Sequence, residues 1–172
     1  MVVLSGSNSR LLATQLAETL GWTHHSLETR RFPDTEGYTR IPEEIIDDVR
    51  SEPVVLVSNT FPDAGIIETL LMLEAINDVR SGKMENLREI GPQQLPDVGP
   101  GILLAIPYFG YSRQDKRFKP GEAISARAIG QLMASRCDGI VVFDLHAPKV
   151  LEDLAVPVAF TSAMPELAKH LQ

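Results

Sequence analysis

Four short polar stretches of this 172-residue sequence contain side chains of the types that bind ligands or take part in catalysis. The first, Ser5-Gly6-Ser7-Asn8, lies between an apolar run and a helical pattern. Backbone N–H groups at such a turn can hold an anion, although a tight turn with a helix cap has the same composition. Neither G-x-x-x-x-G-K-S/T nor G-x-G-x-x-G is present, so the sequence does not support either common type of nucleotide-binding loop.

The second stretch, Arg113–Lys119, is basic within an acidic protein. Four basic residues and one acidic residue give it a net charge of +3, whereas the whole chain carries −7. Arginine offers a planar fork for phosphate oxygens and lysine a mobile point charge, so the stretch suits a polyanion such as a polyphosphate. Tyr108, Phe109 and Tyr111 precede it and can pack against a base. A solvated basic loop explains the same residues equally well.

The third stretch, Asp-Leu-His, directly follows a strand pattern. Strand alternation places Asp144 and His146 on one side. A carboxylate and an imidazole there can hold a divalent cation or act as acid and base. The alternative is that Asp144 caps the next helix and His146 is a surface residue. The other histidines are interpreted as surface residues: His24, His25 and His170.

The fourth stretch is a flap in which Phe32, Asp34 and Glu36 alternate. If the flap is a hairpin, all three side chains point the same way. One aromatic ring and two acceptors can sandwich a base and accept from its exocyclic amine, but a plain polar turn has the same residues.

The elements that position these stretches alternate between β and α. Strands are predicted over 2–4, about 25–31, 37–41, 54–57, 102–106, 139–143 and about 156–160. Helices are predicted from Ser9 to Gly21, over 43–50, about 63–80 and 123–136, in a short segment after 146, and from Pro165 onward. This pattern predicts an α/β fold with a mostly parallel sheet covered by helices on both faces. Ligands bind such sheets beyond the carboxyl ends of the strands.

The amino-acid composition excludes some classes of function. With 23 acidic and 16 basic residues, the chain is not expected to bind nucleic acid or an anionic membrane. No apolar run approaches the ~18 residues of a membrane span, and a single cysteine, Cys137, fits the reducing cytoplasm. The stretch 81–101 has four glycines and three prolines without an apolar period, so a flexible surface insertion is predicted over 82–101.

Five segments in this order resemble ribose-phosphate pyrophosphokinase, the enzyme family that makes phosphoribosyl pyrophosphate. The segments are the S-G-S-N turn at Ser5–Asn8, the R-F-P-D-T-E flap at Arg31–Glu36, the P-Y-F-G-Y-S-R-Q-D-K run at Pro107–Lys116, the I-S-A-R helix start at Ile124–Arg127 and the D-L-H strand end at Asp144–His146. The run around Tyr108–Asp115 is the most specific, and 116–122 is similar to the archaeal branch of the family.

The resemblance implies a phosphoribosyltransferase-like α/β fold with a small antiparallel flap. It also implies transfer of a diphosphoryl group from ATP to ribose 5-phosphate, with Mg²⁺, in a homo-oligomer. Phe32 would stack the adenine, the rest of the flap would line the nucleotide pocket of a neighbouring subunit, and the basic run would contact ATP. The implied ATP-binding residues are Phe32, Asp34, Thr35, Glu36, Arg113 and Gln114, and the implied Mg²⁺ ligand is His146.

The sequence departs from the family pattern at several positions. Thr35 stands where the flap usually has glycine, so a turn that needs positive φ is expected to be altered. Phe118 stands where many bacterial and animal members have Asp. Pro120 and Gly121 replace a Ser-Arg pair associated with allosteric control, which argues against ADP inhibition and phosphate activation. The stretch 149–154 matches poorly.

Family members are also longer, and their second half carries the ribose-5-phosphate loop, the catalytic loop and a further Mg²⁺ ligand. Catalytic residues are therefore expected outside this chain. We interpret 1–147 as the ATP-side domain and 148–172 as the start of a second domain. The chain is then the ATP-binding half of the enzyme, inactive alone. The alternative is a non-catalytic, nucleotide-binding regulatory subunit; a phosphoribosyltransferase-like domain of other specificity is disfavoured by the missing phosphate loop.

Overall fold

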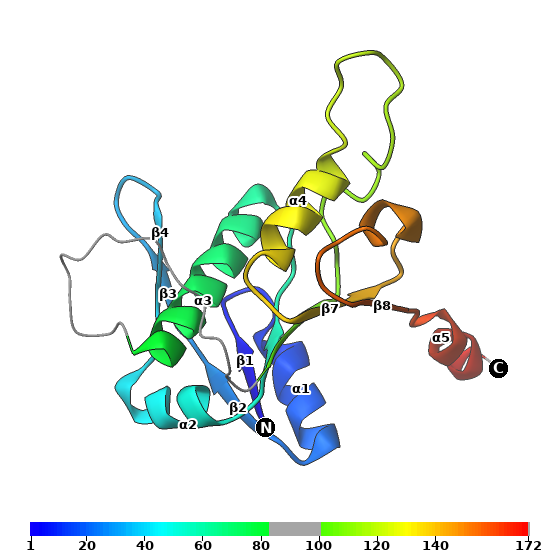
Figure 1. Cartoon of the computed structure of the whole chain (residues 1–172). Coiled ribbons are helices and arrows are strands. Elements are labelled where there is room, and N and C mark those ends of the chain that lie inside the picture. The colour runs from blue at the N-terminus through cyan, green and yellow to red at the C-terminus, as the bar shows by residue number, and fades with distance from the viewer. Residues whose placement is uncertain (83–100, 172) are drawn as a thin grey trace.

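The computed structural model describes residues 1–82 and 101–171, and its centre is a six-stranded parallel sheet (Figure 1). The strand order is β2-β1-β5-β6-β7-β8. These strands are β1 Val2–Ser5, β2 Thr23–Ser26, β5 Val54–Val57, β6 Ile102–Ile106, β7 Gly139–Phe143 and β8 Val158–Thr161. The helices are α1 Arg10–Leu20, the 3-10 turn η1 Glu43–Ile45, α2 Ile46–Ser51, α3 Asp63–Ser81, α4 Ser125–Ala134, the 3-10 turn η2 Pro148–Leu151 and α5 Met164–His170. The predicted α/β fold is thus confirmed. The insertion predicted for 82–101 lies, apart from its two end residues, outside the described residues.

The larger hydrophobic core lies on the face of the sheet covered by α2, α3 and α4. Leu4, Leu56 and Leu104 from three adjacent strands are fully buried there against Met72 and Leu73 of α3. Burying each such side chain contributes about 1.5–3 kcal/mol. The continuous apolar runs of the central strands are typical of a parallel sheet, and they fix the strand ends to which the polar stretches are attached.

The opposite face of the sheet is covered only in part. Helix α1 packs its small residues Ala13 and Ala17 over β1 and β5. Over β6–β8, Leu103 and Phe143 each remain 37% exposed, beside an apolar hollow of about 710 Å³. Among the described residues, helices thus lie on both faces of the sheet, as predicted, but they cover the face over β6–β8 only in part. None of these helices is long and apolar enough to cross a membrane.

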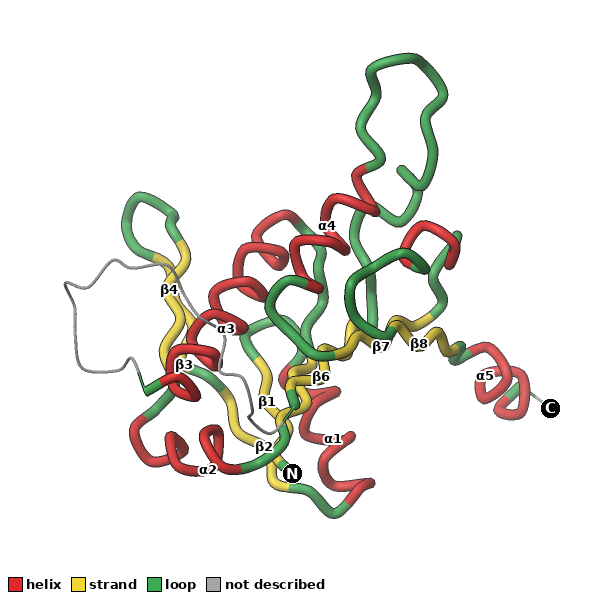
Figure 2. Tube along the Cα trace, viewed as in Figure 1, coloured by secondary structure: helices red, strands yellow, loops and turns green. Residues whose placement is uncertain are grey.

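The predicted strand 25–31 is in fact two strands in two different sheets. β2 belongs to the main sheet, whereas β3 (Glu28–Arg31) pairs antiparallel with β4 (Gly37–Arg40) in a separate hairpin, the flap (Figure 2). The break is Leu27, which is buried and donates its backbone N–H to the carbonyl of Ser5. The flap packs against α3 through β4. The predicted small antiparallel flap is thus present, with different boundaries.

Smaller differences concern the helices. The helix predicted over 43–50 begins as a 3-10 turn and continues as α2 to Ser51, and the helix predicted over 123–136 is shorter, at 125–134. Ser9 occupies the N-cap position of α1, but its hydroxyl donates to Asn8 Oδ1 instead of capping the helix.

His24 and His25 are both partly buried, and His24 makes hydrogen bonds inside the protein. Thr14 Oγ1 donates to the carbonyl of Arg10 at 3.0 Å and therefore accepts from Nδ1 of His24 at 3.1 Å. His24 Nε2 lies 2.9 Å from the buried hydroxyl of Ser5. In the neutral imidazole, Nε2 accepts from that hydroxyl.

We expect acid to destabilise the fold through His24. Burial, and then the charges of His25 and Arg10, lower the pKa of His24. A group whose pKa is lower in the folded state gives stability that is present above its unfolded pKa of about 6.5 and is lost as the pH falls below it. Urea unfolding between pH 8 and 5 should show this loss, and the loss should shrink in His24→Gln but not in the control His170→Gln. Equal pH dependence in wild type and His24→Gln would contradict the assignment.

Candidate functional site

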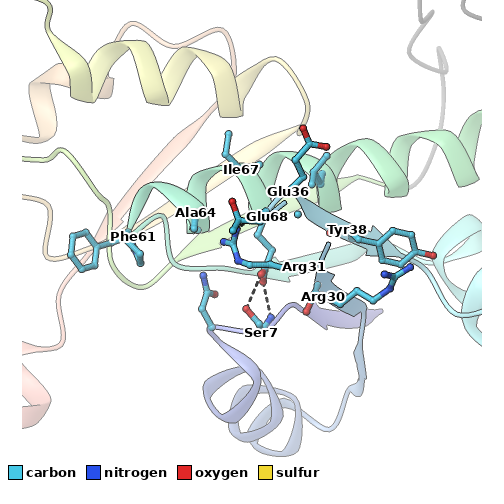
Figure 3. Close-up of a pocket in the computed structure, with 17 residues that line it drawn as sticks. Ser7, Arg30, Arg31, Glu36, Tyr38, Phe61, Ala64, Ile67 and Glu68 are labelled. Atoms are coloured by element: carbon cyan, nitrogen blue, oxygen red, sulfur yellow. Dashed lines mark hydrogen bonds between the residues drawn. The ribbon is translucent and has the colours of Figure 1, made fainter. Parts of the chain in front are cut away.

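A cleft of about 700 Å³ lies between the flap, the turn after β1 and the first turns of α3 (Figure 3). Thr35, Glu36 and Arg31 line it from the flap, and Ser7 and Glu68 from the other two elements. Of the predicted ATP-binding residues it thus contains two. Phe32 and Asp34 lie on the same hairpin but outside the cleft lining.

The Ser5–Asn8 turn uses its donors inside the protein. The backbone N–H and the hydroxyl of Ser7 donate to the two carboxylate oxygens of Glu68, each at 2.7 Å. A Cβ on Gly6 would collide with the same carboxylate. The turn therefore already binds one carboxylate, from α3, and this favours the structural alternative for the stretch over an external anion.

The tip of the flap is a turn whose conformation is fixed by hydrogen bonds within the turn. Phe32 N–H donates to the carbonyl of Glu36, and Thr35 N–H to that of Phe32, both at 2.9 Å. Glu36 N–H donates to Asp34 Oδ1, and Arg31 Nη1 donates to the carbonyl of Thr35 at 2.6 Å. Thr35 adopts a φ of 75°, so the turn keeps a positive φ with threonine in the position.

Replacing Thr35 by glycine is expected to raise the free energy of unfolding by about 1 kcal/mol. A β-branched residue at positive φ costs about 1–2 kcal/mol, which glycine relieves while losing part of the gain to chain entropy. Urea denaturation measures the difference. Thr29→Gly, in the extended strand β3, is the matched control and should destabilise. Lower stability in Thr35→Gly would contradict the argument.

A polar network joins the carboxyl ends of β1, β5 and β6. Asn8 and Asn59 exchange side-chain to backbone hydrogen bonds, and Asn59 Oδ1 accepts from the backbone N–H of Tyr108 at 2.9 Å. The buried hydroxyl of Thr60 accepts from Gly110 N–H at 2.8 Å. A Cβ on Gly110 would collide with the Thr60 carbonyl oxygen. Only glycine thus lets the loop after β6 approach the segment that follows β5 this closely.

The same loop is tied to α3 and α4 further along. Tyr111, at a φ of 62°, donates its hydroxyl to Asp63 at 2.8 Å, and this hydrogen bond raises the pKa of Tyr111. Gln114 accepts from the Ser125 hydroxyl through Oε1 and from Ala126 N–H through its carbonyl. The NH₂ group of the Gln114 side chain makes no hydrogen bond with another described residue, so it can donate to a ligand.

Arg113 is exposed and makes no hydrogen bond or ion pair with another described residue. The following residues curl around Glu122, whose carboxylate accepts from the N–H groups of Phe118 and Lys119, while Arg117 donates to its carbonyl. The basic stretch is thus an ordered, positively charged loop with a guanidinium available at its start.

The Asp144–His146 strand end has a different geometry from the predicted one. β7 ends at Phe143, and Asp144 adopts a left-handed φ of 46°, so strand alternation does not extend to His146. The Asp144 carboxylate accepts from the Ser162 hydroxyl and from Ala163 N–H. Asp144 therefore anchors the segment that leads into α5.

His146 is exposed at the same strand end. Within residues 1–82 and 101–171, no group of three or more His, Cys, Asp or Glu residues could hold a metal ion. Mg²⁺ commonly binds through substrate phosphates, water and one or two side chains, so the residues present fit a phosphate-borne Mg²⁺ but not an all-protein site.

The predicted residues fall in separate places. The flap and the 108–122 loop stand on different parts of the molecule in Figure 1, with His146 following β7. Sequence reasoning missed Glu68, Asn59 and Thr60, because their partners are distant in the chain. It also missed Arg30 and Tyr38, although the alternation of Arg30 with Phe32 in the flap was a usable signal.

Comparison with known proteins gives a consistent result. The sequence profile described as the N-terminal domain of ribose phosphate pyrophosphokinase matches residues 1–85 and 100–136. The ribose-phosphate pyrophosphokinase of Methanothermobacter thermautotrophicus is 37% identical over 172 residues, covering 99% of this chain and 53% of that protein. The enzyme of the same name from Methanopyrus kandleri is 33% identical over 173 residues, covering 99% and 52%.

A solved structure is similar along nearly the whole chain. Phosphoribosylpyrophosphate synthetase from Mycobacterium smegmatis matches with a TM-score of 0.75 and 24% identity, over 99% of this chain and 51% of that one. The likeness shows a shared fold. The chain spans about half the length of the curated relatives it matches.

Proposed function

Because the chain belongs to the family described as the N-terminal domain of ribose phosphate pyrophosphokinase, we propose that it is the ATP-holding half of a ribose-phosphate diphosphokinase. That enzyme transfers diphosphate from ATP to ribose 5-phosphate and releases AMP. The observation that carries the proposal is the loop after β6, which is docked by Asn59 and Thr60 and leaves the Arg113 guanidinium unpaired among the described residues.

In this proposal Arg113 pairs with phosphate oxygens of ATP, and the Gln114 NH₂ group donates to the same ligand. Guanidinium–phosphate pairs are charge-assisted and are frequently bidentate. Diphosphoryl transfer relies mainly on positioning and charge neutralisation. The chain's own contribution is therefore to orient the triphosphate; the ribose-5-phosphate site and the catalytic residues are assigned to the remaining length of the family proteins.

The flap completes the nucleotide site from a second copy of the chain. Phe32 stacks the adenine, and Asp34, Thr35 and Glu36 line the pocket. The separation of the flap from the 108–122 loop supports this arrangement (Figure 1), because one nucleotide contacts both elements most simply when they come from different copies. The proposal therefore includes a homo-oligomer as the binding form.

Mg²⁺ is assigned to the phosphates of the nucleotide, whose charge it neutralises when bound. His146 is the proposed protein contact to that ion, and the Asp144 carboxylate holds the strand end in place through Ser162 and Ala163.

His146→Ala is expected to weaken the Mg²⁺ dependence of ATP binding, because one ligand of the ion is lost. Calorimetric ATP titrations at several Mg²⁺ concentrations measure the dependence. His170→Ala, an exposed histidine of α5, is the control and should behave as wild type. A Mg²⁺ titration of His146→Ala that superimposes on that of wild type would remove its proposed role.

The proposed function is tested by AMP release from Mg-ATP, with and without ribose 5-phosphate, alongside calorimetric ATP binding. We expect the chain alone to bind ATP without releasing AMP. Absence of ATP binding would overturn the proposal. Release of AMP that depends on ribose 5-phosphate would show a complete active site and overturn its restriction to the ATP half. Adding the rest of a relative's chain should restore activity; persistent inactivity there would favour a regulatory subunit.

A further inference from the structure

The flap holds a cation against two aromatic rings. The guanidinium carbon of Arg30 lies over the ring of Phe32 at 4.8 Å from its centroid and over the ring of Tyr38 at 4.1 Å. The two rings meet edge to face, with centroids 5.7 Å apart and an interplanar angle of 83°. None of the roles proposed above uses Arg30 or Tyr38.

Hairpin geometry brings the three side chains together. Arg30 and Tyr38 are direct cross-strand partners in the β3–β4 register, and Phe32 follows Arg30 by two residues on the same face. Figure 3 shows Arg30 beside Tyr38 at the edge of the cleft. The cluster is therefore built into the ladder of the flap.

The rings, and not a carboxylate, set the position of Arg30. Its nearest acidic partner is Glu28, with Nε and Oε1 3.9 Å apart and both side chains about half exposed. Such a pair contributes little to stability. Cation–π contacts at exposed sites contribute about 0.5–1 kcal/mol each, so two of them outweigh the ion pair.

The arrangement leaves Phe32 with one usable face. Phe32 as a whole residue is 39% exposed, the Arg30 guanidinium lies over one face of its ring, and Tyr38 meets the ring edge to face. A base that stacks on Phe32 must approach the side opposite Arg30. Without the cluster, rotation of the ring about χ1 would have to be restricted at the moment of binding, at a cost in conformational entropy.

We propose that Arg30 and Tyr38 are positioning residues that hold the Phe32 ring ready to stack a nucleobase. This inference rests on the proposed function, in which Phe32 stacks the adenine of ATP. Arg30, Phe32 and Tyr38 then form a cluster that exists before the base binds. In it, Arg30 holds the Phe32 ring in place and does not contact the phosphates.

The experiment compares two ligands, Mg-ATP and Mg-tripolyphosphate, by calorimetry with the purified chain and its variants. Arg30→Met and Tyr38→Leu should each lower ATP affinity about two- to fivefold and leave tripolyphosphate affinity unchanged. Arg30→Lys should recover part of the loss because it keeps the cation. Arg40→Met is the matched control: Arg40 lies in the same hairpin but pairs with Glu28 and Glu43, and ATP affinity should stay at the wild-type value.

A double-mutant cycle with Phe32→Leu distinguishes failure of this inference from failure of the proposed stacking on Phe32. In a Phe32→Leu background, Arg30→Met should have no further effect on ATP affinity. If Phe32→Leu weakens ATP binding but the Arg30 and Tyr38 variants do not, the inference is overturned and the proposed function stands. If Arg30→Met weakens ATP and tripolyphosphate equally, Arg30 contacts phosphate and the inference is also overturned. If Phe32→Leu has no effect, stacking itself fails and the inference fails with it.

Discussion

Alanine at position 110 is expected to displace the loop after β6 and lower the free energy of unfolding by about 3 kcal/mol. The added Cβ would collide with the Thr60 carbonyl oxygen, a backbone atom that cannot rotate away. To avoid this collision, the loop must move away from the segment that follows β5. This movement breaks the hydrogen bond from Gly110 N–H to the buried Thr60 hydroxyl. The buried N–H of Gly110 would lose its partner, which adds to the cost.

Urea denaturation measures the stability of Gly110→Ala, and ATP calorimetry measures whether Arg113 has moved with the loop. Gly101→Ala is the matched control, because a Cβ there comes no closer than 3.8 Å to a neighbour, Asp138, and it should change neither quantity by much. A Gly110→Ala chain with wild-type stability and ATP affinity would show that the loop is not held as described.

Arg113→Ala is expected to weaken ATP binding by about 1.5–3 kcal/mol, a loss of ~10- to 150-fold in affinity. Arg113 has no hydrogen bond or ion pair with another described residue, so its removal breaks none. Stability should therefore stay near that of wild type while affinity falls.

Calorimetric titration of Mg-ATP measures the loss. Lys169→Ala, which removes a cation on α5 that pairs with Glu166, controls for the general change in charge and should bind ATP as wild type does. Arg113→Lys should retain part of the affinity, since the charge remains but the planar fork is lost. Unchanged affinity in Arg113→Ala would remove this residue from the site.

The parts of the fold that could be predicted are those with a strong local signal. The strands at 54–57, 102–106 and 139–143 match their predicted bounds, because each of these central parallel strands is a continuous apolar run in the sequence. The break at Leu27 could not be predicted in this way. Leu27 is apolar and buried like a strand residue, and the break is visible only in the pairing: the residues before it pair with β1, and those after it pair with β4.

For the candidate site, the elements that carry its residues could be predicted, but the contacts between those elements could not. The basic loop and the flap were located from composition and spacing. The partner of the Ser5–Asn8 turn, Glu68, was not, because a carboxylate about 60 residues away satisfies it. The alternation argument for Asp144 failed for a similar reason: bonds to Ser162 and Ala163 hold its backbone in a left-handed conformation that ends the strand.

The boundaries of the flap also make it a natural unit for protein engineering. The hairpin lies between two buried residues, Leu27 and Ile41, and it pairs with no strand of the main sheet. A foreign hairpin could therefore be grafted over residues 28–40 without disturbing the register of the six parallel strands, provided that its inner face still fits Leu71 of α3, which would lie 3.4 Å from a Cβ on Gly37. Chimaeras of this kind would exchange one aromatic surface for another on an unchanged scaffold.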